Sequence, residues 1–135
     1  IVTDIITGFP RETEEDHQET VDLLNKLSPD LVNVTRFSPR KGTPASRYKR
    51  VDGRIVKKRS RELTNLRKEL GAKSFKRFVG RETSVLTVEN KRKGSTLCRD
   101  DNYRPIILKQ KLPLGEFYNV KIIDSDYGFM TAKLV

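Results

Sequence analysis

Hydrophobic residues change their spacing along this chain, and that change most constrains its fold. Residues 1–74 hold short apolar runs and leucines at helical spacing, whereas apolar residues from about residue 75 recur at every second position. The two spacings need different elements, because side chains return to one face every 3.6 residues on a helix and every second residue on a strand. The sequence therefore predicts two parts, residues 1–74 and 75–135, that meet between residues 71 and 76.

The first part predicts a strand, a helix and a second strand. Residues 2–7 are rich in β-branched side chains and end before Gly8, as in a buried strand of a parallel sheet. A helix follows Thr13, whose side chain can cap it, and stops at Pro29. Residues 31–37 form the next strand. This order predicts a βαβ unit with parallel strands and a right-handed crossover.

The rest of the chain predicts a loop, a second helix and a set of short strands. Residues 38–46, SPRKGTPAS, leave the carboxyl end of the second strand, where parallel α/β folds carry their chemistry. Residues 59–70 predict a helix with a narrow leucine stripe that stops at Gly71. The later β-rich runs are ETSVLTVEN, PIILKQKL, YNVKIIDSD and FMTAKLV. Their spacing predicts a small all-β sandwich or barrel.

The net charge of +10 is concentrated in the middle of the chain. Residues 47–80 hold thirteen Lys/Arg against three Asp/Glu, compared with five against eight before them and ten against seven after them. Such a segment favours a polyphosphate partner, because each neutralised phosphate releases counterions. A solvated charged surface without a partner stays open as the simpler explanation. An anionic membrane surface is disfavoured, because few large apolar residues oppose the charges.

Several classes of protein are excluded or disfavoured. The sequence has no run of about 18–20 apolar residues that could cross a bilayer, and its first residues lack the pattern of a signal peptide. We therefore expect a soluble, cytoplasmic protein. Cys98 is the only cysteine, so the chain alone can form neither an internal disulfide nor a cysteine-ligated iron–sulfur cluster or zinc site. We expect Cys98 to be a small hydrophobic residue, not a nucleophile.

Linked motifs connect both parts to one family. TDIITGFPRETEEDHQET, followed by VNVTRFSPRKGTPAS, resembles the end of the radical S-adenosylmethionine barrel of tRNA methylthiotransferases, which add a methylthio group to a modified adenosine beside the anticodon. The form RFSPRKGTPA is most similar to the archaeal and eukaryotic branch, which acts on threonylcarbamoyladenosine. The second part resembles the TRAM domain, a β-barrel RNA-binding module, through VGRETSVLTVE, STLCRDDNYRPIIL and LGEFYNVKIIDSDYGFMTAKLV. The resemblance covers nearly the whole chain.

The resemblance implies a fold, a partner and cofactors. The fold is an α/β fragment, the last two βα units of a radical-SAM partial TIM barrel, followed by a small all-β TRAM or OB-like barrel. The partner is tRNA, and the parent protein carries two 4Fe-4S clusters and S-adenosylmethionine. The family's cluster cysteines are absent from this sequence. We therefore expect the chain to be inactive alone and to need the missing N-terminal part of the same protein. Where the barrel is cut, we expect residues 1–7 and 31–37 to be covered by self-association or by exchange of segments between chains, or to be poorly ordered.

The resemblance also assigns residues in the first part. Gly8 and Phe9, at the end of the first strand, are expected beside S-adenosylmethionine, although a turn glycine explains Gly8 equally well. Arg36, Arg40 and Thr43 are expected to bind substrate. Either arginine is suited to the carboxylate of the threonylcarbamoyl group, because a guanidinium binds a carboxylate through two parallel hydrogen bonds.

Two residues depart from the family pattern. Arg11 stands where glycine is usual, and His17 stands where an aromatic or apolar residue is common, so we expect local differences in the turn and in the helix packing. We interpret His17 as an exposed helix residue and not as a catalytic base, because no catalytic partner lies at helical spacing from it.

A basic turn and an aromatic residue between arginines are the candidates for RNA binding. Cations neutralise backbone phosphates, and an unstacked base can lie on an aromatic ring. We interpret Phe117 and Phe129 as residues that fill the barrel. The candidate RNA-binding residues are Lys91, Arg92, Lys93, Arg99, Tyr103 and Arg104.

The sequence leaves rival functions. The leading one is the C-terminal region of a methylthiotransferase that supplies tRNA binding. The alternative is a free-standing basic RNA-binding protein with no catalytic role, in which residues 1–71 serve only for docking. A small α/β enzyme in its own right is disfavoured, because no nucleophile, paired carboxylate or metal cluster lies at usable spacing.

Overall fold

The structure is a computed structural model that describes residues 1–91 and 94–135, and it divides into two compact units, Ile1–Gly71 and Ala72–Val135. The elements of the first unit are β1 (Val2–Thr7), α1 (Glu14–Leu27), β2 (Leu31–Arg36), the 3-10 turn η1 (Pro44–Arg47) and most of α2 (Gly53–Lys76). The elements of the second are β3 (Glu82–Lys91), β4 (Ser95–Arg99), β5 (Pro105–Leu108), β6 (Phe117–Ser125) and β7 (Met130–Leu134).

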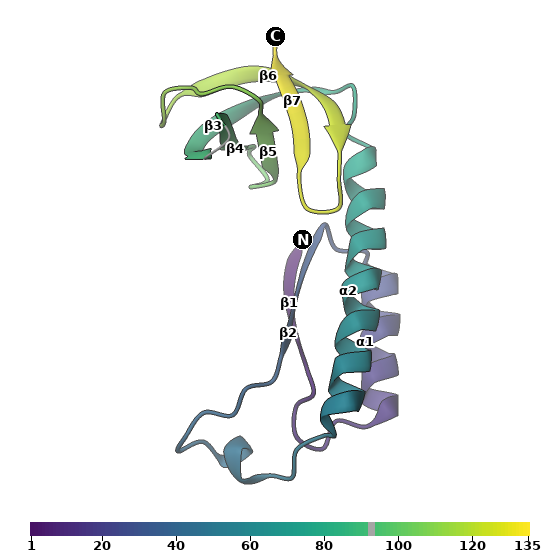
Figure 1. Cartoon of the computed structure of the whole chain (residues 1–135). Helices are drawn as coiled ribbons and strands as arrows, with labels where there is room; N and C mark the ends of the chain where they lie inside the picture. Colours follow the sequence, from purple (N-terminus) through teal and green to yellow (C-terminus); the bar gives the residue numbers. More distant parts are fainter. Residues whose placement is uncertain (92–93) are drawn as a thin grey trace. The chain divides into compact units, whose positions relative to one another are not determined.

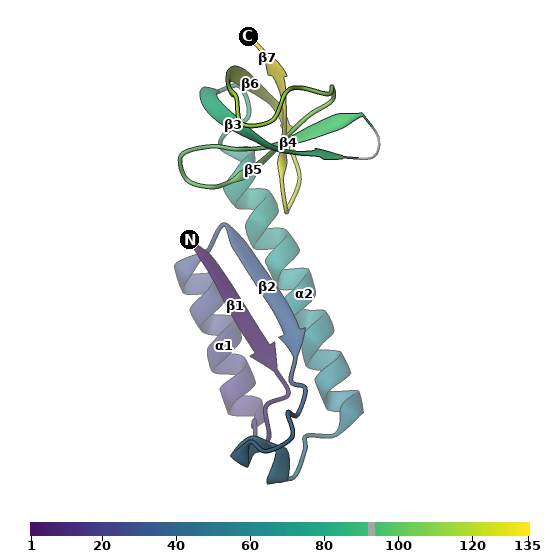
Figure 2. The ribbon, with the colours of Figure 1, turned by 90° about the vertical axis from the view of Figure 1, so that its left-hand side faces the viewer.

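The first unit is a parallel pair of strands covered on one face by helices. β1 and β2 pair in register from Val2 opposite Leu31 to Thr7 opposite Arg36, which confirms the predicted parallel βαβ unit. Both α1 and α2 lie behind the pair in Figure 2, and Figure 1 shows them on the same side. The core between the layers contains Leu24, Val32, Leu63 and Leu70.

Local capping explains where α1 begins and ends. Thr13 Oγ1 accepts the N–H of Asp16 at 3.1 Å, and the Asp16 carboxylate accepts the N–H of Thr13 at 2.8 Å. These hydrogen bonds from Thr13 lower the pKa of Asp16, so the cap is charged at neutral pH. At the other end Ser28 takes a left-handed conformation with φ of 45°, and Pro29 follows it.

The second helix is longer than predicted, so the expected stop at Gly71 is wrong. α2 begins at Gly53 and continues through Gly71 to Lys76. A glycine ends a helix only where the chain leaves in the left-handed conformation; inside a helix it costs only about 1 kcal/mol relative to alanine. Phe75, in the added turn, is fully buried and offsets that cost. No helix within the described ranges is long and apolar enough to cross a membrane.

The second unit is a closed five-stranded barrel with the strand order β3-β4-β5-β7-β6 (Figure 1), which confirms the predicted barrel. Its pairs are antiparallel except for β5 and β7, which are parallel. The fully or nearly fully buried side chains inside it are Val85, Cys98, Ile106, Leu108, Val120, Ile122, Met130 and Ala132.

Two details of the barrel differ from the sequence-based interpretation. β4 was not predicted, because the residues that it turns inward are Thr96 and Cys98, which carry no clear hydrophobic alternation. The interpretation of Phe117 and Phe129 as filling residues is wrong, since Phe117 is 73% and Phe129 is 39% exposed. Phe117 opens β6 on the outward side of the strand, while Val120 and Ile122 fill the interior.

Candidate functional site

A cleft opens at the carboxyl ends of β1 and β2 and contains all three predicted substrate-binding residues. Its volume is about 400 Å³. The strand ends supply Ile6 and Arg36, and the following loop supplies Arg40 and Thr43. Parallel strands bring their carboxyl ends to the same edge, which is why the end of β2 and the loop after it converge there. The lining residues are Ile6, Thr35, Arg36, Phe37, Ser38, Arg40, Thr43 and Ala45.

The two arginines of the cleft are available to an anion. Arg36 and Arg40 are both exposed, and no carboxylate among the residues that the structure describes forms an ion pair with either. Thr43 has a structural role in the same loop: its hydroxyl donates to the Arg40 carbonyl at 2.8 Å, and its N–H reaches the same oxygen at 3.2 Å. Thr43 therefore fixes the backbone that carries Arg40, and its oxygen can still accept a hydrogen bond.

The structure accounts for Gly8 without a ligand. Gly8 has a φ of +77°, and a Cβ added to it would lie 2.7 Å from both Val56 methyl carbons, so α2 fills the space beside its Cα. Its N–H donates to Glu12 Oε2 at 3.0 Å. The torsion and the contact with Val56 thus each favour glycine at this position, as the turn-glycine explanation expects. Phe9 differs, because its ring is 48% exposed and meets Phe37 edge-on with the ring centroids 5.1 Å apart.

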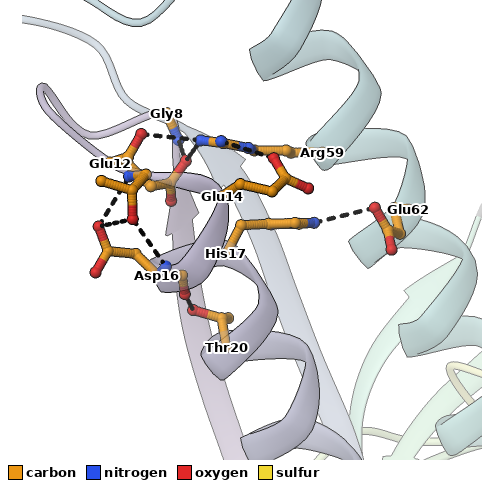
Figure 3. Close-up of polar contacts among 9 residues, drawn as sticks. Gly8, Glu12, Glu14, Asp16, His17, Thr20, Arg59 and Glu62 are labelled. Atoms are coloured by element: carbon orange, nitrogen blue, oxygen red, sulfur yellow. Dashed lines mark hydrogen bonds and ion pairs between the residues drawn. The ribbon is translucent and has the colours of Figure 1, made fainter.

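A polar network holds the turn between β1 and α1 (Figure 3). Arg59, buried on α2, donates to Glu12 Oε2 at 2.8 Å, to the Glu12 carbonyl at 3.1 Å and to Glu14 Oε2 at 2.9 Å. Burial opposes the charge of Arg59, but the hydrogen bonds to Glu14 and Glu12 outweigh it and raise the pKa of the guanidinium. The hydrogen bond from Arg59 also lowers the pKa of Glu14. Arg59 therefore ties this turn to α2.

The interpretation of His17 as an exposed residue is wrong. His17 is 1% exposed, and its Nε2 lies 3.0 Å from Glu62 Oε2 on α2, as Figure 3 shows. Its Nδ1 is buried without a hydrogen-bond partner among the described residues. Helical spacing gave no partner, because Glu62 lies 45 residues further along the chain. The position is buried, which agrees with the aromatic or apolar residues common there in the family that the motifs resemble.

Arg11 takes a backbone conformation that favours glycine. Its φ is 72°, and its guanidinium lies over the Tyr48 ring at 4.2 Å from the centroid. The turn thus keeps a glycine-type torsion although arginine stands there, and the contact with Tyr48 compensates part of the strain.

No set of residues within the described ranges fits a metal cluster. No group of three or more His, Cys, Asp or Glu side chains is close enough to hold an ion. Cys98 is fully buried inside the barrel, and burial raises the pKa of its thiol to about 11. A buried, protonated thiol is a poor metal ligand, because ligation requires the thiolate.

The barrel brings together three of its candidate RNA-binding residues. Arg99 donates to the Tyr103 carbonyl at 3.0 Å and stacks on the Tyr103 ring at 4.7 Å from the centroid. Arg104 forms more contacts within the barrel unit than Arg99 does: it forms an ion pair with Asp100 at 2.8 Å, and its guanidinium lies over the Phe78 ring at 4.0 Å from the centroid. Lys91 lies opposite Ser95, at the other end of β4 from Arg99, and pairs with Glu89. Arg92 and Lys93 lie outside the described residues.

Comparison with known proteins finds matches to the residues of both units. Residues 76–135 match the TRAM domain family. The chain is 42% identical to a "Probable threonylcarbamoyladenosine tRNA methylthiotransferase" of Archaeoglobus fulgidus over 99% of this chain and 31% of that protein. Proteins of the same name match at 35% identity in Pyrococcus horikoshii (98% of this chain, 31% of that protein) and 41% in Methanocaldococcus jannaschii (98% and 30%).

The chain belongs to the tRNA methylthiotransferase family. It spans about a third of the length of the curated relatives that it matches. Within this family its five-stranded barrel is the TRAM domain, and the β1–α1–β2–α2 unit lies in the matched region that precedes that domain.

Proposed function

We propose that this chain is the C-terminal, tRNA-binding region of a threonylcarbamoyladenosine tRNA methylthiotransferase. The observation that carries the proposal is the combination of a TRAM barrel with a parallel βαβ unit whose strand ends gather Arg36, Arg40 and Thr43 in one cleft. The names of the archaeal relatives favour this substrate over other modified adenosines. In this proposal the βαβ unit is the last portion of the radical-SAM barrel.

The barrel and the basic segment before it supply affinity for tRNA. Residues 72–135 hold thirteen Lys/Arg against seven Asp/Glu, and residues 47–71 add ten against three. Cations at this density attract the phosphate backbone without reading sequence. Arg99 and Tyr103 add a guanidinium and an exposed ring, which are suited to an unstacked base.

The cleft of the first unit receives the modified nucleoside. A threonylcarbamoyl group ends in a carboxylate, and Arg36 and Arg40 are two exposed guanidiniums on one cleft. Arg40 is the better placed of the two for a bidentate contact, because Thr43 holds its backbone through two hydrogen bonds. Arg36, at the end of β2, adds a second positive charge to the lining.

The cofactors of the parent protein lie mainly outside these residues. Two 4Fe-4S clusters and S-adenosylmethionine supply the methylthio transfer when they are bound. We place the clusters on the remainder of the protein, because Cys98 is buried and protonated. Phe9, with its exposed ring at the end of β1, is our candidate for a contact with S-adenosylmethionine, whereas the space beside Gly8 is filled by Val56.

Binding of tRNA tests the first half of the proposal. The chain should bind a fluorescently labelled tRNA with a micromolar dissociation constant, and the logarithm of the affinity should fall linearly with the logarithm of the salt concentration. Replacing Lys91, Arg92 and Lys93 together with alanine should weaken binding and reduce the salt slope, with the far-ultraviolet circular dichroism unchanged. Affinity that hardly responds to salt would exclude electrostatic binding.

A comparison of two tRNAs tests the cleft. tRNA that carries threonylcarbamoyladenosine should bind more tightly than the same tRNA without the modification. Arg40→Ala and Arg40→Lys should both abolish the difference, since lysine keeps the charge but loses the paired donors. Lys41→Ala is the matched control, because Lys41 is exposed beside Arg40 but does not line the cleft. Equal affinities of the wild-type chain for the two tRNAs would reject the assignment of the cleft.

A further inference from the structure

We propose that Phe117, Leu86, Arg99 and Tyr103 form one outward-facing row on the barrel, and that this row stacks unpaired bases of an RNA strand. The proposal rests on the proposed function, that the barrel binds RNA. It adds Phe117, which the sequence did not indicate, and it restricts the ligand to single-stranded segments.

Strand register places the four residues side by side. Phe117 on β6 lies directly opposite Leu86 on β3, and Leu86 lies directly opposite Arg99 on β4. Partners in an antiparallel pair have their Cα atoms about 5 Å apart and present their side chains on the same face. Tyr103 extends the row beyond β4, because its ring packs on the Arg99 guanidinium at 4.7 Å.

Burial shows that the row faces outward. On β3 the neighbours of Leu86 are Val85 and Thr87, which are buried, and alternation along the strand therefore turns Leu86 to the outside. Cys98 and Asp100, on either side of Arg99, are buried in the same way. At the ends of the row, Phe117 and Tyr103 are each 73% exposed, more than the other aromatic side chains of the described residues.

The backbone at Tyr103 is held in a costly conformation. Its φ is 62°, a region that most residues with a side chain avoid. Hydrogen bonds to Asp100 fix the turn. The Asp100 carbonyl accepts the N–H of Tyr103 at 2.8 Å, and the Asp100 carboxylate accepts the N–H groups of Asn102 and Arg104 at 3.1 and 2.9 Å. Such a conformation persists only where the surroundings enforce it, and it often marks a functional position. Here its result is an exposed ring stacked on a guanidinium.

The chemistry of the row fits a nucleic acid strand. Two aromatic faces offer stacking, and between them Arg99 carries a positive charge that forms no ion pair with any carboxylate among the described residues. The strand spacing separates Phe117 from Arg99 by about 10 Å, so the two rings at the ends of the row receive different bases. Rings accept the face of a base only when that base is unpaired, which excludes the interior of a duplex.

The test compares RNA with and without bases. The full chain is titrated with a fluorescein-labelled single-stranded RNA of about ten nucleotides, with the same strand made abasic at its central positions, and with a duplex of that sequence. Phe117→Ala and Tyr103→Ala should each raise the dissociation constant for the single strand about fivefold or more, and should leave the abasic strand and the duplex unchanged. The salt slope should stay constant, because no charge is removed.

Two further variants make the result decisive. Phe117→Tyr should restore the affinity, because it keeps the ring. Phe129→Ala removes another exposed aromatic side chain, outside the row, and should have no effect. If the wild-type chain binds RNA and the Phe117 and Tyr103 variants bind equally well, the row is rejected while the proposed function stands. Equal losses for the intact and abasic strands also reject stacking. If the wild-type chain binds no RNA, both proposals fail.

Discussion

Arg59 on α2 reaches across to Glu12 in the turn after β1, where its guanidinium donates to the carboxylate at 2.8 Å and to the carbonyl at 3.1 Å. The same carboxylate oxygen accepts the N–H of Gly8. One buried cation thus organises the turn that follows β1. This turn places the Phe9 ring against the Phe37 ring. The candidate cleft therefore depends on this arrangement, because Phe37 lines it.

Removing the Arg59 side chain should therefore destabilise the first unit strongly. Arg59→Ala should lower the free energy of unfolding by about 3 kcal/mol or more, because a partly buried carboxylate is left without its partner. Urea denaturation followed by circular dichroism measures the loss. Arg54→Ala is the control, since its side chain is 95% exposed, and it should change the free energy by less than about 0.5 kcal/mol. Equal effects of the two substitutions would contradict a buried role for Arg59.

His17 makes a second link between α1 and α2, and its replacement should depend on size more than on charge. His17→Ala should cost about 2 kcal/mol or more, because it leaves a cavity in a fully buried position. His17→Leu should stay within about 1.5 kcal/mol of the wild type, since it fills the space and removes the unpartnered Nδ1. Urea midpoints decide between these outcomes. A leucine variant as unstable as the alanine variant would show that the Glu62 contact dominates.

The sequence predicted those features of the fold that depend on neighbouring residues. β1, α1 and β2 follow from apolar runs and from the Thr13 cap, which are local signals. The substrate candidates Arg36, Arg40 and Thr43 meet in one cleft because they lie within eight residues on one strand end and its loop.

Features that depend on distant contacts were missed. Glu62 approaches His17 only through the packing of two helices, so no local pattern identified this partner. The burial of His17 could have been predicted from helical spacing, because His17 lies four and seven residues before Val21 and Leu24 of the core. β4 was not predicted because one of its buried residues is the polar Thr96, whose hydroxyl lies 2.8 Å from both Asn90 Oδ1 and the Gln110 carbonyl. Hydrogen bonds, not hydrophobicity, make that residue suitable for the interior. Phe117 was assigned to the core because aromatic residues usually belong there.

The left-handed conformation of Arg11 leads to a prediction about side chains that lack the Tyr48 contact. Arg11→Gly should be more stable than Arg11→Ala by about 1 kcal/mol, because glycine adopts a φ of +72° without the steric cost. Both variants lose the cation–π contact, so that their difference isolates the backbone effect. Thermal unfolding of the pair provides the measurement. An alanine variant as stable as the glycine variant would contradict backbone strain at this position.

The burial of the Cys98 thiol predicts a loss of barrel stability at alkaline pH. Burial raises the pKa of its thiol from 9.0 to about 11, so the folded state favours the protonated form. The resulting stabilisation is complete below pH 9 and is lost as the pH rises through about 11, a change on the order of 2 kcal/mol. Unfolding by urea at several pH values from 7 to 10.5 should show a steeper decline for the wild type than for Cys98→Ala. Parallel declines would mean that the thiol titrates normally.

The face of β1–β2 opposite the two helices predicts self-association. Along β1 more exposed residues alternate with less exposed ones, which places Val2 and Ile6, 60% and 57% exposed, on that face on either side of Asp4. Exposed apolar side chains of this size favour burial against a partner. Among the residues that the structure describes, no further strand pairs with β1 or β2, and the free edges favour pairing with a second copy. Light scattering should therefore give a mass above 15.6 kDa that increases with concentration, and Val2→Lys with Ile6→Lys should restore the monomer. Leu23→Lys, at a comparably exposed site on α1, should not. A wild-type chain that stays monomeric at every concentration would exclude association through this face.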